Sequence, residues 1–254
     1  MIEQDSEFHI KCKKGDISRY VILTGDPGRV SYIASFLDKS YFVSSNREFT
    51  IYNGYIDGEL VTICSHGIGG PSTAICVEEL HHLGADTFIR VGTCGGISLD
   101  VKAGDIVIAT SAIRYDHTSL EYVPIEFPAV SDFNITMNLV SAANEGKYNY
   151  HLGIVQCKDS FYGQHYPENM PVKEELFYKW NAWKRLNVLA SEMESSTLFV
   201  VSSYLKCRSS SLFNVVWNQE RQKELNDFSM MEKLEDVIKV AIEGMKKIIK
   251  EDKK

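Results

Sequence analysis

Residues 65–97 constrain the fold of this chain more than any other stretch. They combine an apolar helical stripe, a short link and a buried strand, set between two glycine-rich segments. Pro71 suits the first turn of a helix, where its missing N–H costs nothing, and Gly84 is placed to end that helix. Residues 87–91 are mostly apolar and β-prone, as in a parallel strand covered on both faces. This order of elements predicts an α/β fold.

Arg90 is the anomaly within that strand. An arginine in a buried strand is costly unless an anionic group meets it. The glycine-rich residues 92–96, which we predict to form a turn, follow directly and offer backbone N–H groups and the Thr93 hydroxyl. Open α/β sheets bind ligands at this C-terminal end of their strands. We therefore expect an oxyanion site here, most simply for phosphate.

Length and composition narrow the class of protein. We expect a single domain over residues 1–254. The net charge of −7 argues against nucleic-acid or anionic-membrane binding as the main role. No apolar segment reaches the roughly 18–20 residues of a membrane span, and the polar N-terminus predicts no secretory signal. The cysteines form no CxxC pair and the histidines no metal-binding spacing, so we expect reduced thiols, a cytoplasmic protein and no metal.

The first half of the chain contains three further candidate features. A strand at 19–23 leads into TGDPGR at 24–29, which is either a ligand-binding connection or an ordinary turn. A hairpin at 41–52 carries Arg47 and Glu48 in its middle, where charges ordinarily face solvent. The long connection at 111–131 indicates a functional segment or an interface.

The second half of the chain contains two more candidate features. A strand at 151–157 opens into 158–166, whose aromatic residues beside Gln164 predict either a pocket for a planar ring or a surface loop. Glu192 and Glu194 lie near the start of a helix. Their negative charges either stabilise the positive end of the helix dipole or accept hydrogen bonds from sugar hydroxyls. The other expected strands are 60–64, 105–110 and 211–217, and the helices are roughly 29–37, 132–145, 172–185, 194–205 and 229–249.

Together these features describe one composite site. It would comprise glycine turns at 25–28, 67–70 and 92–96, arginines at 29, 47 and 90, a ring pocket at 161–164 and the glutamates at 192–194. Such a site has an oxyanion end, a hydroxyl-binding middle and an end for a planar base. A nucleoside together with phosphate fits that description.

Eight segments also carry a resemblance to a known family. They are Phe8-His9, TGDPGRV at 24–30, NREFT at 46–50, GIGGPST at 67–73, VEELHHLGADTFIRVGTCGGI at 77–97, LEYVPIEFPAVSDF at 120–133, DSFYGQ at 159–164 and SEMESSTL at 191–198. With these segments the chain resembles the hexameric-type nucleoside phosphorylases over nearly its whole length, and is closest to the uridine phosphorylases. The resemblance implies a three-layer α/β/α fold around a central mixed, partly barrel-like sheet. It also implies a homohexamer (a trimer of dimers) or a homodimer with shared active sites.

The resemblance further implies roles for individual residues. The phosphate-binding residues would be Gly25, Arg29, Arg90 and Thr93, joined by Arg47 from a neighbouring subunit. The ribose-binding residues would be Glu192, Met193, Glu194 and His9, the last again from a neighbouring subunit. The base-binding residues would be Phe161, Gln164, Cys94 and Gly95. Of all these, Arg90, Glu194 and Gln164 are the expected catalytic residues.

The reaction implied is that of a pentosyltransferase of nucleoside catabolism and salvage. Uridine and inorganic phosphate, as co-substrates, would give uracil and ribose 1-phosphate reversibly, with no cofactor required and no metal. Glu48, Ile68 and Ser72 match a family position that leaves room for a monovalent cation between subunits.

The chain departs from the family pattern where the base is chosen. The base-binding arginines of uridine phosphorylases are replaced by Tyr166 and Gln219, and the purine branch's aspartate is replaced by Asn218 or Trp217. The main alternative is therefore a purine nucleoside phosphorylase for inosine, adenosine or guanosine with a divergent base pocket. A nucleosidase that uses water, and a non-catalytic nucleoside-binding protein, are the further alternatives.

Overall fold

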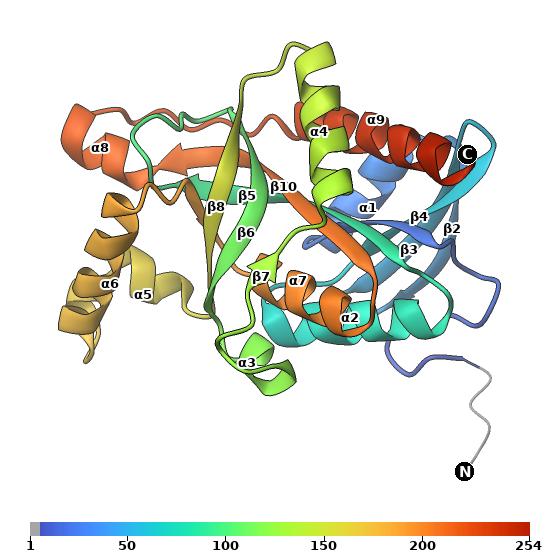
Figure 1. The fold of residues 1–254 in the computed structure, drawn as a ribbon, viewed down its shortest axis with the longest axis horizontal. Helices are drawn as coiled ribbons and strands as arrows, with labels where there is room; N and C mark the ends of the chain where they lie inside the picture. Colours follow the sequence, from blue (N-terminus) through green and yellow to red (C-terminus); the bar gives the residue numbers. More distant parts are fainter. Residues whose placement is uncertain (1–5) are drawn as a thin grey trace.

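A central mixed sheet with helices on both faces forms the body of the molecule (Figure 1). The computed structural model describes residues 6–254, so the polar N-terminus behind the expectation of no secretory signal lies outside the described residues. The strands are β1 (Tyr20–Thr24), β2 (Asp38–Asn46), β3 (Phe49–Ile56), β4 (Glu59–Ser65), β5 (Thr87–Gly96), β6 (Ile106–Tyr115), β7 (Ala129–Val130), β8 (Tyr150–Lys158), β9 (Ala190–Glu192) and β10 (Arg208–Asn218). The helices are α1 (Pro27–Ala34), α2 (Gly70–His82), α3 (Thr118–Tyr122), α4 (Phe133–Glu145), α5 (Phe161–His165), the 3₁₀ turn η1 (Pro167–Asn169), α6 (Lys173–Arg185), α7 (Ser195–Tyr204), α8 (Gln219–Leu225) and α9 (Leu234–Asp252).

Part of the sheet closes on itself. Strand β5 pairs with β10, β10 with β6, β6 with β8, β8 with β9, and β9 with β5, so these strands form a closed ring of pairings. From β5 the sheet continues through β1, β4, β3 and β2. Parallel pairs such as β1–β5 and β5–β10 occur beside antiparallel pairs such as β6–β10. The predicted α/β fold with a mixed, partly barrel-like sheet is thus confirmed.

An apolar core lies on each side of the sheet. One core packs α2 and α7 against the strands, and the other packs α1, α4 and α9 against the opposite face (Figure 1). Successive strand residues face opposite sides, so Phe88 enters the first core and Ile89 the second. Each fully buried side chain of this size stabilises the fold by about 1.5–3 kcal/mol. Arg90 follows Ile89, and alternation therefore places it on the same face as Phe88.

Two helix starts form as their sequences predict. The Asp26 side chain accepts a hydrogen bond of 2.8 Å from the Gly28 N–H at the start of α1, and Pro27 occupies the first turn. Helix α2 begins after Gly69, whose φ of 88° is a left-handed conformation that favours glycine. Both helix starts follow a strand end, so they bring backbone N–H groups to the same edge of the sheet.

The glycine-rich segment 92–96 is not a turn, and that prediction was wrong. Strand β5 runs through it to Gly96, because β10 pairs with β5 along its whole length. Close packing explains the glycine composition, since a Cβ on Gly96 would lie 2.5 Å from Nδ2 of Asn218. Strand β6 likewise continues to Tyr115, beyond the predicted end at 110.

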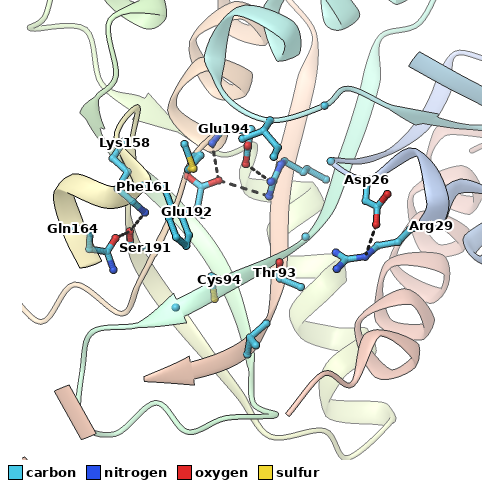
Figure 2. A pocket seen from close by; sticks show the side chains of 18 of the residues that line it. Asp26, Arg29, Thr93, Cys94, Lys158, Phe161, Gln164, Ser191, Glu192 and Glu194 are labelled. Atoms are coloured by element: carbon cyan, nitrogen blue, oxygen red, sulfur yellow. Dashed lines mark hydrogen bonds and ion pairs between the residues drawn. The ribbon is translucent and has the colours of Figure 1, made fainter. Parts of the chain in front are cut away.

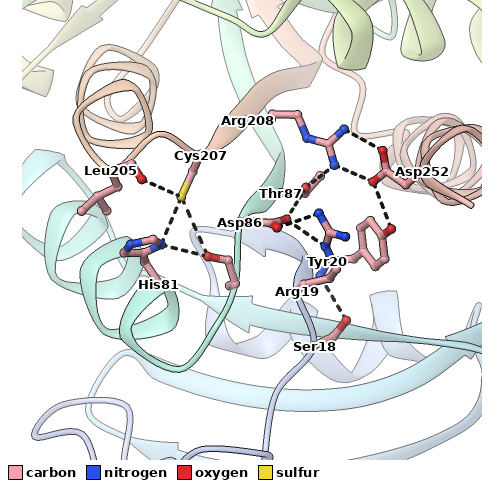
Figure 3. A network of polar contacts seen from close by, with 11 residues as sticks. Ser18, Arg19, Tyr20, His81, Asp86, Thr87, Leu205, Cys207, Arg208 and Asp252 are labelled. Atoms are coloured by element: carbon pink, nitrogen blue, oxygen red, sulfur yellow. Dashed lines mark hydrogen bonds and ion pairs between the residues drawn. The ribbon is translucent and has the colours of Figure 1, made fainter.

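A pocket lies at one end of the parallel strands, and a network of hydrogen bonds lies at the other. The C-terminal ends of β1 and β5 border the pocket drawn in Figure 2. At the opposite ends, Arg208 of β10 donates to Oγ1 of Thr87 (2.7 Å) and to Oδ2 of Asp252 (2.6 Å) at the end of α9 (Figure 3). The Tyr20 hydroxyl of β1 donates to the same Asp252 oxygen at 3.0 Å. These bonds join three strands and the last helix at the edge away from the pocket.

Membrane-spanning helices are absent from residues 6–254, since none of the helices there is both long enough and apolar enough to cross a bilayer.

Candidate active site

A cavity of about 810 Å³ opens at the C-terminal ends of β1 and β5 (Figure 2). All but two of the residues predicted for the site line it: Gly25, Arg29, Arg90, Thr93, Cys94, Gly95, Phe161, Gln164, Glu192, Met193 and Glu194. They come from β1, α1, β5, α5 and the segment that joins β9 to α7. A volume of this size suits a small-molecule ligand. The structure therefore brings together segments that are more than a hundred residues apart in sequence.

Arg90 is a buried cation that lines this cavity. Its side chain is 4% exposed, its Nη2 forms an ion pair with Oε2 of Glu194, and its Nη1 lies 3.6 Å from Oε2 of Glu192. Within residues 6–254, Nε and Nη1 of Arg90 have no hydrogen-bond partner. Buried donors are normally satisfied, so these two N–H groups are suited to an oxyanion. The neighbouring Thr93 adds a hydroxyl on the same strand.

Arg29 stands across the cavity from β5, at the start of α1. Its Nη2 donates to Oε1 of Glu232 at 2.7 Å, and its Nε lies 3.6 Å from Oδ2 of Asp26. The side chain is 26% exposed, so these ion pairs are weakened by solvent. Arg29 can therefore exchange an acidic partner for a bound anion at modest cost.

The two glutamates have different surroundings. Glu192 accepts hydrogen bonds from the backbone N–H groups of Glu194 (3.0 Å) and Ser195 (3.0 Å) at the start of α7. Burial raises the pKa of Glu192, although Arg90 opposes that rise. Glu194 instead accepts from the Gly69 N–H at 2.7 Å and pairs with Arg90. Helix-terminal stabilisation therefore explains Glu192 well, whereas Glu194 is held beside the cavity by groups outside its own helix.

Aromatic rings line the far end of the cavity. The Phe161 ring lies 4.3 Å from the His165 ring, which in turn lies 5.5 Å from Trp217, measured between centroids. Burial, and secondarily Lys158, lower the pKa of His165 to about 4, so the ring is neutral at neutral pH. Gln164 presents its amide beside these rings and accepts a hydrogen bond of 2.6 Å from Ser191. A planar base can stack on such rings while the amide pairs with its edge.

Lys158 and Ser191 line the same end and were missed by the sequence analysis. Lys158 is 4% exposed, and its Nζ donates to Oγ of Ser191 at 2.6 Å. The Ser191 hydroxyl also contacts Gln164 (Figure 2) and Gln156. A lysine after an apolar strand is ordinarily exposed. The available signal was its position directly after Val155-Gln156-Cys157, which continues the buried strand by one residue.

The two predicted residues outside the cavity are Arg47 and His9. Arg47 is exposed at the turn between β2 and β3 with a φ of 53°. The His9 side chain contacts Glu79, and its Nδ1 lies 2.6 Å from a carboxylate oxygen of that residue. Because both were predicted to act in a neighbouring subunit, that role stays a prediction. The candidate cation residues gather around one turn, where Ser72 Oγ donates to the carbonyl of Ile68 at 3.2 Å and Glu48 packs beside Gly67.

Comparisons with known proteins agree with this geometry. Residues 19–251 match the model of the phosphorylase superfamily. The uridine phosphorylase of Treponema pallidum (strain Nichols) is 50% identical over 248 residues, which cover 98% of this chain and 96% of that protein. The uridine phosphorylase of Haemophilus influenzae is 40% identical (92% and 95% covered), and the guanosine phosphorylase of Halorubrum lacusprofundi is 37% identical (92% and 94% covered). This chain belongs to the phosphorylase superfamily.

Proposed function

We propose that the protein is a uridine phosphorylase, a pentosyltransferase that converts uridine and phosphate reversibly to uracil and ribose 1-phosphate. The observation that carries the proposal is one cavity with Arg90 at one end, Glu194 in the middle, and Gln164 beside aromatic rings at the other. The 50% identity to a protein named uridine phosphorylase over nearly the full chain supports it. Residues 19–251 match one family model, which supports a single domain over 1–254.

Phosphate binds between Arg90 and Arg29, with Gly25 and Thr93 completing the site. Nε and Nη1 of Arg90, which have no hydrogen-bond partner within residues 6–254, bind this anion, and Arg29 closes on it from α1. As the glycosidic bond breaks, the sugar becomes positively charged and resembles an oxocarbenium ion. The phosphate dianion stabilises that charge and is aligned to attack the same carbon. Positioning and electrostatics then account for the rate, without a covalent enzyme intermediate.

Ribose occupies the middle of the cavity. Glu194, fixed by Arg90 and the Gly69 N–H, accepts hydrogen bonds from the sugar hydroxyls. Met193 covers the ring from the same segment. Since the carboxylate is already oriented, little side-chain freedom is lost when the nucleoside binds.

The base stacks against Phe161 and pairs with the Gln164 amide. Cys94 and Gly95 of β5, which also line the cavity, lie beneath it. A Cβ on Gly95 would lie 3.6 Å from Trp217 Nε1, so this part of the strand lies next to the indole. The narrow, aromatic end suits a flat heterocycle.

Self-association completes the site in this proposal. Arg47 and His9, which lie outside the cavity of their own chain, reach the cavity of a second copy. The apolar side chains of Ile125 (57% exposed), Phe127 (41%) and Phe133 (75%) also leave a surface that a second copy would cover. A homohexamer or a homodimer would both bring Arg47 and His9 to a second cavity and cover this apolar surface. Reduced cysteines, five of the six buried, are consistent with a cytoplasmic enzyme.

Turnover assays test the function directly. Uridine, inosine, adenosine and guanosine are each incubated with the enzyme, with and without phosphate, and the released base is quantified. We expect phosphate-dependent release of uracil with the highest kcat/KM. Preferential release of guanine would favour the second candidate, which the 37% identity to a guanosine phosphorylase supports.

Two other outcomes would reject phosphorolysis altogether. Base release that does not depend on phosphate would identify a nucleosidase, contrary to the open donors of Arg90. Tight nucleoside binding without any turnover would identify a binding protein.

A further inference from the structure

Lys158, the last residue of β8, is a buried cation without an acidic partner. It is 4% exposed, and lysines are almost never this buried unless they are paired. Its Nζ donates to Ser191 Oγ at 2.6 Å, and it forms no ion pair with any residue in 6–254. An ammonium group has three donors, so this arrangement leaves two N–H groups without a protein acceptor.

The Ser191 contact decides which way the ammonium group faces. Lys158 borders both the large cavity and a second cavity of about 430 Å³ beneath α6. Ser191 lines the large cavity and is absent from the lining of the second. The Ser191 hydroxyl in turn contacts Gln164, the residue placed against the base edge (Figure 2). The Lys158 Nζ therefore lies at the base end of the large cavity.

The other basic side chains that line the cavity do not supply a positive charge at its base end. Arg90 pairs with Glu194, Arg29 pairs with Glu232, and His165 is neutral at neutral pH. Burial lowers the pKa of Lys158, with Glu192 opposing that effect. A more acidic ammonium group is a stronger hydrogen-bond donor. The base end of the large cavity thus has one buried cationic donor beside the uncharged side chains of Gln164, His165 and Ser191.

We propose that Lys158 is a catalytic residue that donates a hydrogen bond to a carbonyl oxygen of the departing pyrimidine. This inference rests on the proposed function and deepens it. When the C1′–N1 bond breaks, its electron pair stays on N1 and spreads onto the carbonyl oxygens of uracil. A phosphate oxygen forms the new bond to C1′, and the proton carried by that phosphate reaches N1 through solvent. Lys158 transfers no proton; its fixed charge stabilises the anion as it develops.

The test compares leaving groups of different basicity. Fluorine at C5 makes the base more acidic, so the 5-fluorouracil anion needs less stabilisation than the uracil anion. We measure kcat and KM of Lys158→Met with uridine and with 5-fluorouridine at saturating phosphate. We expect kcat for uridine to fall about 10²-fold, the scale of one preorganised donor, and kcat for 5-fluorouridine to fall less. The KM for phosphate should stay unchanged, and Lys158→Arg should recover part of the loss.

The matched control is Lys239→Met on α9. Lys239 is about half exposed and pairs with Glu235 one helical turn away, so the same substitution there should leave both substrates unaffected. If Lys158→Met does not fold, Lys158→Gln removes the charge with less change in polarity and is measured in the same way.

The outcomes separate this inference from the proposed function. An active wild type whose Lys158 variant is unchanged, or loses equally on both substrates, leaves uridine phosphorylase intact and overturns the role of Lys158. A wild type that releases no uracil overturns both.

Discussion

Arg90 and Glu194 form a buried ion pair that joins the anion end of the cavity to its sugar end. The side chains are 4% and 6% exposed, and the second carboxylate oxygen of Glu194 accepts from the Gly69 N–H. Glu194 therefore depends on Arg90 for its charge compensation, whereas Arg90 also lies near Glu192. Removing one partner of such a pair costs about 3–5 kcal/mol, because the other charge is left buried and unpaired.

Arg90→Ala should consequently fail in two measurable ways. We expect at least a ~10²-fold loss of rate at limiting phosphate, together with a lower urea midpoint for unfolding. Arg185→Ala, at an exposed position on α6, is the control and should match the wild type in both assays. An unchanged rate at limiting phosphate would remove Arg90 from the anion site.

Gly92→Ala should disturb the same guanidinium without removing it. A Cβ at Gly92 would collide with Nη1 and Cζ of Arg90, whose far end is held by Glu194. We expect the KM for phosphate to rise while the protein stays folded, as steady-state kinetics and circular dichroism would report. Gly95→Ala places its Cβ 3.6 Å from Trp217, an ordinary contact, and should leave the KM for phosphate nearer the wild-type value. The same KM in all three proteins would contradict the close approach.

Shared sites predict complementation between two inactive variants. Arg47→Ala removes a residue that acts in the neighbouring subunit, and Arg29→Ala removes one that acts in its own. When equal amounts are refolded together, half of the random dimers are mixed and each mixed dimer keeps one intact site. Phosphorolysis should therefore return to roughly a quarter of the wild-type rate. Refolded mixtures that stay as inactive as the separate variants would show that Arg47 does not cross the boundary.

Asp252 gives a pH-dependent contribution to stability. The hydrogen bond from Arg208 lowers the pKa of Asp252 below its ordinary value of 3.8. A carboxyl group whose folded pKa is lowered stabilises the protein above the unfolded pKa, and that contribution is lost as pH falls through the folded pKa. Asp252→Asn should thus be less stable than the wild type by about 1 kcal/mol at neutral pH, after allowance for partial exposure.

Urea unfolding across a range of pH measures this difference. It should shrink as the pH falls below 3.8 and through the lower folded pKa of Asp252, because the carboxyl group is then protonated and both proteins are uncharged at this position. Glu243→Gln, at an exposed position on α9, serves as the control with little effect at any pH. If the difference in unfolding free energy between Asp252→Asn and the wild type did not depend on pH, packing and not charge would explain it.

The sequence predicted the helix–strand unit at 70–91 and the position of Arg90, because apolar periodicity and an isolated buried charge are local signals. It did not predict that β5 continues through the glycines to Gly96. That extension depends on pairing with β10, which lies more than a hundred residues later. Glycine composition favours a turn locally, and tertiary pairing overrides that preference.

Lys158 shows the same limit at the site itself. Its type predicts exposure, whereas its burial follows from the placement of β8 beside β9 in the closed ring of strands. For the connection at 111–131, the sequence indicated a functional segment or an interface but not the contact that shapes it. Arg114 donates hydrogen bonds to the carbonyls of Pro124 and Phe127.

The bond between Tyr20 and Asp252 spans 232 positions of the chain, and this has a consequence for synthesis on the ribosome. Strand β5 gains β1 early, but its other long neighbour, β10, emerges only after residue 208, and the last helix later still. At roughly 5–20 residues per second, a nascent chain therefore exposes Arg90 and one edge of β5 for many seconds. We expect no nucleoside to be captured before residues 192–194 have emerged, because Glu192 and Glu194 line the cavity.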